Sequence, residues 1–385
     1  MIRNAKIVMV AMFKNEASVL RRMLDSTLGY CDYYVMQNNG STDGSDQIAQ
    51  QFLRENNLRG EIYVCEEGWQ GFGWNRDHLI QYCQNVDHGC DWILKMDCDE
   101  VLEVDEDFDW SPLDDKQIHS FHIAAISGSC IYYRAWMWNA NMQWAFQHDP
   151  AHEIIYCTDP VIGENFYRYS LPQSIRQVGY NEGQSWGVPT KFVSDSLILE
   201  EKLIREQTML SDPYHFWYIG KSYADAWPCS SFPLGEIQQR EFARRAIFYF
   251  TQYNQWKHPN GPNFGTVDEL AYFGEVLIGY AYQFLKEYDS ARMHWANADR
   301  WISVYNRSEH LLALAELYDF LGQYEDMLAV TKVLVNPENK CPFPDMMSFV
   351  DRNAYVDTSG YPNELHNKAI KQTSSNVFQV RQQYG

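Results

Sequence analysis

The sequence predicts an α/β domain with a mostly parallel sheet, followed by an all-α domain of helical repeats. In the first hundred residues, short apolar runs alternate with segments of helical periodicity, which is typical of parallel strands joined by crossover helices. From Val193 onward, apolar residues recur mainly at helical spacing. The predicted division is 1–205 for the α/β domain, 206–340 for the helical repeats and 341–385 for a C-terminal extension that is partly loop.

Length, hydrophobic content and net charge limit the classes of protein to which this chain can belong. The chain has 385 residues, of which 45% are hydrophobic, so its length favours two or three domains with large cores. Its formal net charge of −20 is the opposite of what a protein needs to bind the phosphate backbone of nucleic acids. The same charge disfavours an anionic membrane surface. We therefore expect no nucleic acid among the partners.

The cysteines and the N-terminus indicate a cellular location. Nine cysteines are scattered without a CxxC pair, so neither a zinc site of the usual spacing nor a disulfide framework is expected. The N-terminal apolar stretch ends before Lys14 and is too short for a signal peptide. No run approaches the ~18 apolar residues of a membrane span. These features predict a reducing, cytoplasmic location and no integral membrane segment.

The elements of the α/β region follow from local patterns. Short apolar runs predict buried strands, and apolar residues every three or four positions predict helices. In chain order the strands are 6–12, 33–36, 61–65 and 92–96, and the helices are 16–28, 45–55 and 74–84. Between the second strand and its helix, residues 38–45 (NNGSTDGS) form a polar turn whose free backbone N–H groups make a candidate anion or nucleotide site. An ordinary helix cap is the alternative.

A cluster of carboxylates follows the fourth strand. Residues 92–96 lead directly into Asp97, Asp99 and Glu100, and carboxylates at the end of a buried strand repel one another and are costly to desolvate. A divalent cation would make them tolerable, and hard oxygen ligands suit Mg²⁺ or Mn²⁺, which also bind phosphate. The alternative is an acidic loop that leaves the strand, since residues 103–109 are also acid-rich.

Arg76 lies near the start of the third predicted helix, after a glycine-aromatic loop. It could pair with a phosphate or with the Asp97 or Asp99 carboxylate. A solvated arginine on a helix surface is the alternative.

Taken together, these motifs resemble the family 2 glycosyltransferases of the GT-A fold. The resemblance implies a nucleotide-sugar-binding domain in which Asp97 and Asp99 form the Asp-x-Asp (DXD) pair that holds Mn²⁺ or Mg²⁺ against the diphosphate, with Asp99 the direct ligand. It assigns further residues to the nucleotide, namely Asn15, Glu16, Asn38, Asp43, Arg76 and Asp97. The chain departs from the family where it has Asn38-Asn39 in place of a common Asp-Asp, and Arg76-Asp77 in place of Arg-Asn.

The region 117–156 carries the candidate catalytic residues. Strands are predicted at 118–126 and 129–134, and the aromatic cluster Trp136, Trp138, Trp144 and Phe146 is either an acceptor-sugar platform or core. Displacement of a nucleoside diphosphate with inversion needs a base near the acceptor hydroxyl. Glu153 is the first candidate, and His152 would be a third metal ligand or would hold Glu153. His148 and Asp149 are reserves. A purely structural His152–Glu153 contact is the alternative.

The resemblance extends further along the chain. The subgroup that this chain most resembles has a His-Glu pair, a Gly-Tyr and a lysine, which correspond here to His152-Glu153, Gly179-Tyr180 and Lys191. A helical-repeat region after the catalytic domain also occurs in that subgroup.

The second half of the chain predicts paired helices. Helices are expected over 196–210, 214–226, 302–317 and 327–334. The segment 284–289 (FLKEYD) is similar to 320–325 (FLGQYE), about 36 residues later, which resembles tetratricopeptide-type repeats. Ala281, Ala291, Ala315 and Ala329 would lie at helix crossings. The repeats could bind a protein partner, mediate self-association, complete the acceptor cleft or only cap the catalytic domain.

The sequence thus predicts a metal-dependent glycosyltransferase of the hexosyltransferase type. It would move a sugar from a nucleotide sugar, with UDP as the nucleotide, to a glycan or other hydroxyl acceptor with inversion. Two alternatives remain. A sugar nucleotidyltransferase shares the sheet and the metal carboxylates but typically has a glycine-rich loop after the first strand, where this chain has residues 13–16 (FKNE). A non-catalytic helical-repeat scaffold with a relic α/β domain has no reason to keep Asp97 and Asp99.

Overall fold

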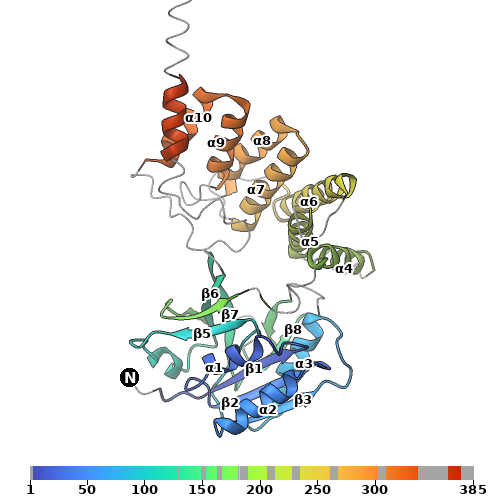
Figure 1. The fold of residues 1–385 in the computed structure, drawn as a ribbon, viewed down its shortest axis with the longest axis vertical. Helices are drawn as coiled ribbons and strands as arrows, with labels where there is room; N and C mark the ends of the chain where they lie inside the picture. The colour runs from blue at the N-terminus through green and yellow to red at the C-terminus, as the bar shows by residue number, and fades with distance from the viewer. Residues whose placement is uncertain are drawn as a thin grey trace, which may run out of the picture. The chain divides into compact units, whose positions relative to one another are not determined.

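The computed structural model describes residues 3–127, 130–148, 153–162, 167–180, 182, 190–205, 213–227, 235–260, 268–301, 309–336 and 363–373 (Figure 1). Contacts within the chain divide it into two compact units, Met1–Lys191 and Phe192–Gly385. The first unit is an α/β domain with a mostly parallel sheet and the second is helical, as the sequence predicts. The division assigns helix α4 (Lys191–Arg205) to the helical unit, whereas the predicted boundary followed residue 205.

The first unit is built on a mostly parallel sheet, which has nine strands in the described residues. The strand order is β3-β2-β1-β4-β7-β6-β11-β5, with β10 beside β6. The strands are β1 (Ile7–Phe13), β2 (Tyr33–Asn38), β3 (Arg59–Val64), β4 (Trp92–Lys95), β5 (Glu100–Val104), β6 (Ser120–Ser127), β7 (Cys130–Asn139), β10 (Arg168–Ser170) and β11 (Ile175–Gly179). A separate hairpin joins β8 (Trp144–Phe146) to β9 (Ile155–Cys157).

Helices cover both faces of this sheet, and the alternation of β1 side chains shows how. One core cluster combines Ile7, Met9 and Ala11 of β1 with residues of helices α1 (Leu20–Ser26) and α2 (Ser45–Glu55). The other combines Val8 and Val10 with residues of α3 (Phe72–Asn85). A strand that is buried on both faces reads as a continuous apolar run, which is why β1 was predictable.

The acid-rich stretch after β4 begins with a strand, whereas the alternative drawn from the sequence was an acidic loop. Residues 100–104 form strand β5, which pairs antiparallel with β11 through contacts such as Glu100 with Gly179 and Leu102 with Gln177. The side chains of Val101 and Leu102 are buried, and Glu103 is half-buried. The carboxylates of the Asp97–Glu100 turn are therefore held between two strands and do not belong to a free acidic loop.

The helical unit consists of paired helices. They are α4, α5 (Pro213–Ala226), α6 (Glu236–Lys257), α7 (Glu269–Phe284), α8 (Tyr288–Ala298), α9 (Glu309–Leu321) and α10 (Tyr324–Leu334). None of the described helices is long and apolar enough to cross a membrane.

The two similar segments noted in the sequence occupy equivalent turns. Residues 284–289 join α7 to α8, and residues 320–325 join α9 to α10. Lys286 (φ 64°) and Gly322 (φ 71°) take the same left-handed conformation in these turns. Ala281, Ala291 and Ala315 are buried as predicted, but Ala329 is exposed, so the prediction for Ala329 was wrong.

A further helix lies in the predicted C-terminal extension. Residues 363–373 are helical, and the buried Leu365 and Ala369 pack in one cluster with Leu312, Ala315 and Met327 of α9 and α10. Part of that extension therefore completes the core of the helical unit.

Candidate active site

The predicted site residues lie at one edge of the parallel sheet. Strand β1 pairs parallel with β2 on one side and with β4 on the other, so the chain reverses its direction of winding between β1 and β4. In open α/β sheets, ligands bind beyond the carboxyl ends of the strands at such a switch point. Asn15, Asn38 and Asp97 follow or end these three strands, and the sequence therefore predicted this convergence correctly.

Polar side chains tie the loop after β1 to the loop after β2. Asn15 has a left-handed backbone (φ 58°), and its Oδ1 accepts a hydrogen bond of 2.7 Å from the Thr42 backbone N–H. The backbone N–H of Glu16 donates to Ser45 Oγ at 2.8 Å. These bonds satisfy backbone groups that would otherwise be left without partners at the sheet edge, and they fix the shape of the edge.

Asp43 belongs to the same tie. Its carboxylate accepts from the Ala17 backbone N–H at 2.9 Å and from the Ser45 hydroxyl at 2.6 Å. Partial burial alone would raise the pKa of Asp43, but the hydrogen bonds from Ser45 and Ala17 outweigh it and lower the pKa. In the structure Asp43 thus positions the two loops.

A buried amide network supports the second loop. Asn38 Oδ1 accepts from the backbone N–H groups of Gly40 and Ser41, at 3.1 and 2.8 Å. Asn39, 2% exposed, accepts at Oδ1 from the side chains of Gln37 (2.8 Å) and Asn75 (3.0 Å). Both asparagines of the motif are therefore used by the protein itself, which the sequence pattern did not reveal.

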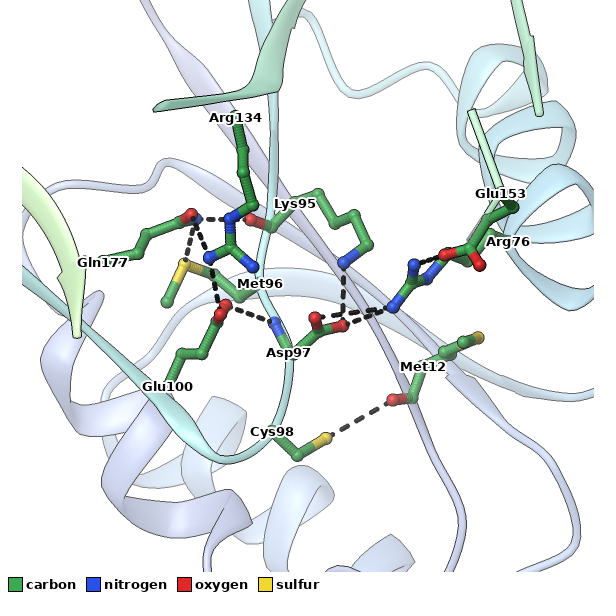
Figure 2. Close-up of polar contacts among 10 residues, drawn as sticks. All are labelled: Met12, Arg76, Lys95, Met96, Asp97, Cys98, Glu100, Arg134, Glu153 and Gln177. Atoms are coloured by element: carbon green, nitrogen blue, oxygen red, sulfur yellow. Dashed lines mark hydrogen bonds and ion pairs between the residues drawn. The ribbon is translucent and has the colours of Figure 1, made fainter. Parts of the chain in front are cut away.

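Asp97 is held between two cations (Figure 2). Lys95 Nζ lies 2.7 Å from Asp97 Oδ1, and Arg76 Nη2 lies 3.1 Å from the same oxygen. Burial alone would raise the pKa of Asp97, but the Lys95 ammonium and the Arg76 guanidinium hold it below its usual range. Burial, reinforced by the Arg76 charge, lowers the pKa of Lys95 to about 7. The sequence-based pairing of Arg76 with Asp97 is thus present.

Arg76 also contacts Glu153. The guanidinium forms an ion pair with the Glu153 carboxylate, whose side chain is only 5% exposed (Figure 2). Arg76 comes from the first turns of α3 and Glu153 from the segment before β9. One guanidinium therefore links Asp97 to Glu153, the predicted catalytic base.

A fourth ion pair, between Arg134 and Glu100, lies on the other side of Asp97 (Figure 2). Arg134 of β7 donates to Glu100 at 2.5 Å and to Gln177 Oε1 at 3.2 Å. Glu100 Oε2 in turn accepts from the Asp97 backbone N–H at 3.2 Å. The ring of Trp136 lies against both cations, with Lys95 Nζ 3.2 Å and Arg134 Cζ 3.3 Å from its centre.

These pairs revise one argument drawn from the sequence. Asp97, Glu100 and Glu153 each have a protein cation as partner, so these three carboxylates are compensated within the protein, and the argument for a metal ion rests on Asp99. The sequence did contain a sign of these ion pairs, because a lysine within an apolar strand and an arginine within a predicted strand both need buried partners. Lys95 and Arg134 are the residues that sequence reasoning missed.

The carboxylate chemistry still fits Mg²⁺ or Mn²⁺. These ions are often bound by one or two carboxylates together with substrate phosphates. Asp99 is half-buried in the turn before β5, and its backbone carbonyl accepts from the Tyr180 N–H at 3.1 Å. Within the described ranges, the one group of three or more His, Cys, Asp and Glu ligands that could hold an ion lies elsewhere and contains neither Asp97 nor Asp99.

The remaining predicted residues fall into three groups. His152 and Asp149 lie outside the described residues. His148 Nε2 lies 3.1 Å from Asp77 on α3, so it braces the segment before β9. In the aromatic cluster, Trp138, Trp144 and Phe146 are core residues, and only Trp136 faces the ion pairs.

Comparison with known proteins identifies the domain. Residues 8–108 match the family model described as "Glycosyl transferase family 2". This stretch runs from β1 to just beyond β5 and contains both tied loops, Arg76 and the Asp97–Glu100 turn. No curated protein sequence matches the chain.

Solved structures align over most of the chain at low identity. They include S. aureus TarS 1–349 in complex with UDP-GlcNAc (11% identity, 77% of this chain and 89% of that chain, TM-score 0.35) and without it (TM-score 0.36, same identity and coverage). The mannosyltransferase PcManGT from Pyrobaculum calidifontis, in complex with GDP-Man and Mn²⁺, aligns at 13% identity (78% and 88%, TM-score 0.37). From the family match, the N-terminal domain belongs to glycosyl transferase family 2, and the chain is a glycosyltransferase.

Proposed function

We propose that this glycosyltransferase moves a hexose from a UDP-sugar to a hydroxyl group of a glycan or similar acceptor, with inversion, and that Glu153 is the base. The observation that supports this most directly is the position of Arg76, which contacts both Asp97 and Glu153. Arg76, which can bind phosphate, is thereby paired with Glu153, the candidate base, in the absence of substrate.

The shared arginine suggests how the donor prepares the base. Arginine binds phosphate oxygens through paired hydrogen bonds, so an incoming diphosphate competes with Glu153 for Arg76. Once Arg76 turns to the diphosphate, Glu153 is left as an unpaired carboxylate in a site from which water is largely excluded. It can then accept a proton from an acceptor hydroxyl.

The transfer itself balances without another reactant. The acceptor O–H gives its proton to Glu153 while its oxygen forms a bond to the anomeric carbon. The bond from that carbon to the diphosphate oxygen breaks on the opposite face, and the nucleoside diphosphate leaves with the electron pair. Arg76 stabilises the charge that develops on the leaving group.

Asp99 is the residue that would hold Mn²⁺ or Mg²⁺, with His152 as a further candidate ligand. A bound divalent ion would neutralise charge on the leaving diphosphate. Asp97 remains fixed by Lys95 and Arg76 and would position the nucleotide end of the donor. The nucleoside pocket would be shaped by the hydrogen bonds that join the two loops, which involve Asn15, Glu16, Asn38 and Asp43. Backbone groups of these loops would then recognise the base directly.

The test combines binding with turnover. Thermal shift with UDP-, GDP-, CMP- and dTDP-sugars, each with and without Mn²⁺, should show a metal-dependent rise in Tm with the UDP-sugar. Asp99→Asn should abolish the metal dependence of that rise. Glu153→Gln should keep the shift but lower sugar transfer at least ~100-fold, the lower range of a lost general base. Glu103→Gln, a half-buried carboxylate paired with Arg176, is the matched control.

Each outcome of these measurements tests one part of the proposal: the nucleotide, the catalytic base or donor binding itself. A shift with another nucleotide would replace UDP and leave the mechanism standing. Full activity in Glu153→Gln would remove Glu153 as the base. If no nucleotide sugar shifts the Tm in either metal condition, the donor proposal is wrong and the helical unit becomes the place to look for a partner.

A further inference from the structure

Cys65, Glu67 and His78 form a group of potential metal ligands within the N-terminal domain, and neither the ion pairs nor the proposed transfer use them. One ligand atom from each residue lies within 4.8 Å of the others. Cys65 directly follows β3, Glu67 lies two residues later, and His78 is in the second turn of α3. The group therefore connects the loop after β3 to the helix that carries Arg76.

The loop is folded so that Glu67 returns to the cysteine. The Cys65 N–H donates to the Asn38 carbonyl at 3.0 Å, which fixes the cysteine at the sheet edge. The Gly68 N–H donates to the Cys65 carbonyl at 3.0 Å, and Gly68 adopts the left-handed conformation (φ 67°) that closes this tight turn. As a result, Glu67 Oε2 lies 3.7 Å from Cys65 Sγ.

Hydrogen bonds outside the group set the tautomer of His78. Gln37 Nε2 donates to Asn39 Oδ1 at 2.8 Å, which orients the Gln37 amide and directs its Oε1 at His78 Nδ1, 3.1 Å away. The Tyr63 hydroxyl donates to the same Oε1 at 2.5 Å. The Tyr63 hydroxyl also lies 3.3 Å from His78 Nδ1, but its proton is directed at Gln37 Oε1. Because Oε1 can only accept, the histidine proton then belongs on Nδ1 and the lone pair on Nε2. Metal-binding histidines are usually held by a partner to their second ring nitrogen in this way.

The thiol also has a suitable environment for a bound cation. Asn75 Nδ2 lies 3.8 Å from Cys65 Sγ and donates to Asn39 Oδ1 and to the Gly68 carbonyl, each at 3.0 Å, so it fixes the loop around the thiol. Asn75 and His78 are three residues apart, so both project from the same face of α3. Cysteine binds a metal as the thiolate, so a divalent ion in this group would be compensated by two negative charges, those of Cys65 and Glu67.

We propose that Cys65, Glu67 and His78 bind one Zn²⁺ ion, with water in the fourth position. In a tetrahedral site of ordinary Zn–S, Zn–N and Zn–O bond lengths, the ligand atoms lie roughly 3.5 Å apart. The Sγ to Oε2 separation is already close to this value, and Glu67 is exposed and free to adjust. A thiolate and an imidazole favour Zn²⁺ over Mg²⁺ and Mn²⁺, so this site would not compete for the ion of the transfer reaction.

The bound ion would fasten the loop after β3 to α3. The full-length protein, stripped with a chelator and titrated with Co²⁺ as a spectroscopic substitute for Zn²⁺, should develop a near-ultraviolet thiolate-to-Co²⁺ band that saturates at one equivalent. Zn²⁺ should displace the Co²⁺ and abolish the band. Addition of Zn²⁺ to the stripped protein should raise its Tm. Mn²⁺ at the same concentration should not reproduce the band or displace the Co²⁺.

Variants decide whether the site is the proposed one. Cys65→Ser should abolish the band, and Glu67→Gln and His78→Ala should each weaken Co²⁺ binding at least ~10-fold. Cys157→Ser, which changes a half-buried cysteine on β9 outside the group, should bind like the parent. The proposal is overturned if the parent shows no thiolate band or if Cys65→Ser keeps it. Should Cys65→Ser fail to fold, the exposed Glu67→Gln variant decides: unchanged Co²⁺ affinity would exclude the site.

Discussion

A buried lysine in an apolar strand is costly unless its charge is compensated, and Lys95 is the last residue of such a strand, β4. Its side chain is 3% exposed, and its ammonium lies 2.7 Å from Asp97 and 3.2 Å from the centre of the Trp136 ring. The partners on both sides replace the water that burial removes. Lys95 therefore holds the Asp97 carboxylate in the orientation that Arg76 also contacts.

Replacement of Lys95 by methionine should destabilise the protein by about 3 kcal/mol, because it leaves Asp97 partly buried with only Arg76 to compensate it. The double variant Lys95→Met/Asp97→Asn should recover part of that loss. Urea denaturation at neutral pH measures both. Lys116→Met is the matched control, since Lys116 is 79% exposed and its contact with Asp91 spans 3.6 Å, which predicts a change under ~1 kcal/mol. Equal losses in Lys95→Met and Lys116→Met would contradict the assigned role.

At the scale of elements, the loops after β1 and β2 behave as one unit. Asn15, Ser41, Asp43 and Ser45 exchange side-chain bonds with backbone groups across the gap between the strands. The edge of the sheet is thereby shaped before a nucleotide arrives. Such preorganisation reduces the ordering cost of binding.

Asp43→Asn tests this tie through its dependence on pH. The folded protein holds the pKa of Asp43 below 3.8, so the carboxylate contributes stability above about pH 4 and loses it as the pH falls through the folded pKa. The variant should be less stable than the parent by about 1 kcal/mol at pH 7. The two should converge below pH 4 in denaturation curves recorded across that range. Asp46→Asn is the control, because the Asp46 carboxylate accepts from the side chain of Gln50 in the same helix and does not join the two loops, and it should follow the parent throughout. A constant gap between Asp43→Asn and the parent at every pH would contradict the assignment.

The elements show which features a sequence can predict. Strands β1, β2 and β4 and the helices between them follow from local apolar spacing, and their order placed Asn15, Asn38 and Asp97 at one edge. Strand β5 is harder to predict because its acidic residues resemble a loop, and only the partner β11, about 75 residues later, makes it a strand. Local periodicity contains no information about such a partner.

The same distinction holds for the candidate site. The family resemblance pointed to Arg76, Asp97 and Glu153 one by one, but their arrangement depends on the turn after β4, helix α3 and the segment before β9 meeting in space. The sequence argument for a metal counted the carboxylates without the cations Lys95, Arg76 and Arg134, so the metal prediction now depends on Asp99. Asp43 was assigned to the nucleotide, whereas its oxygens are used by backbone and hydroxyl groups of the loops.

At the scale of the whole molecule, the two compact units should unfold as two transitions, and one glycine tests this in the helical unit. A Cβ atom on Gly279 of α7 would lie 2.2 Å from Trp295 Nε1 on α8, a fully buried ring. Gly279→Ala should therefore overpack this crossing and cost about 1–3 kcal/mol. Gly274→Ala in the same helix meets nothing closer than 3.6 Å and serves as the control.

Differential scanning calorimetry should then assign each transition to its unit. Gly279→Ala should lower the midpoint of one transition by several degrees and leave the other in place, because overpacking in the helical unit strains only the structure that unfolds with it. A UDP-sugar with Mn²⁺ should raise the transition that Gly279→Ala does not affect, since a ligand stabilises only the unit to which it binds. Gly274→Ala should leave both midpoints close to those of the parent. If Gly279→Ala lowers every transition equally, or if the nucleotide sugar raises the same transition that Gly279→Ala lowers, the chain unfolds as one cooperative unit and donor binding depends on the helical unit as well.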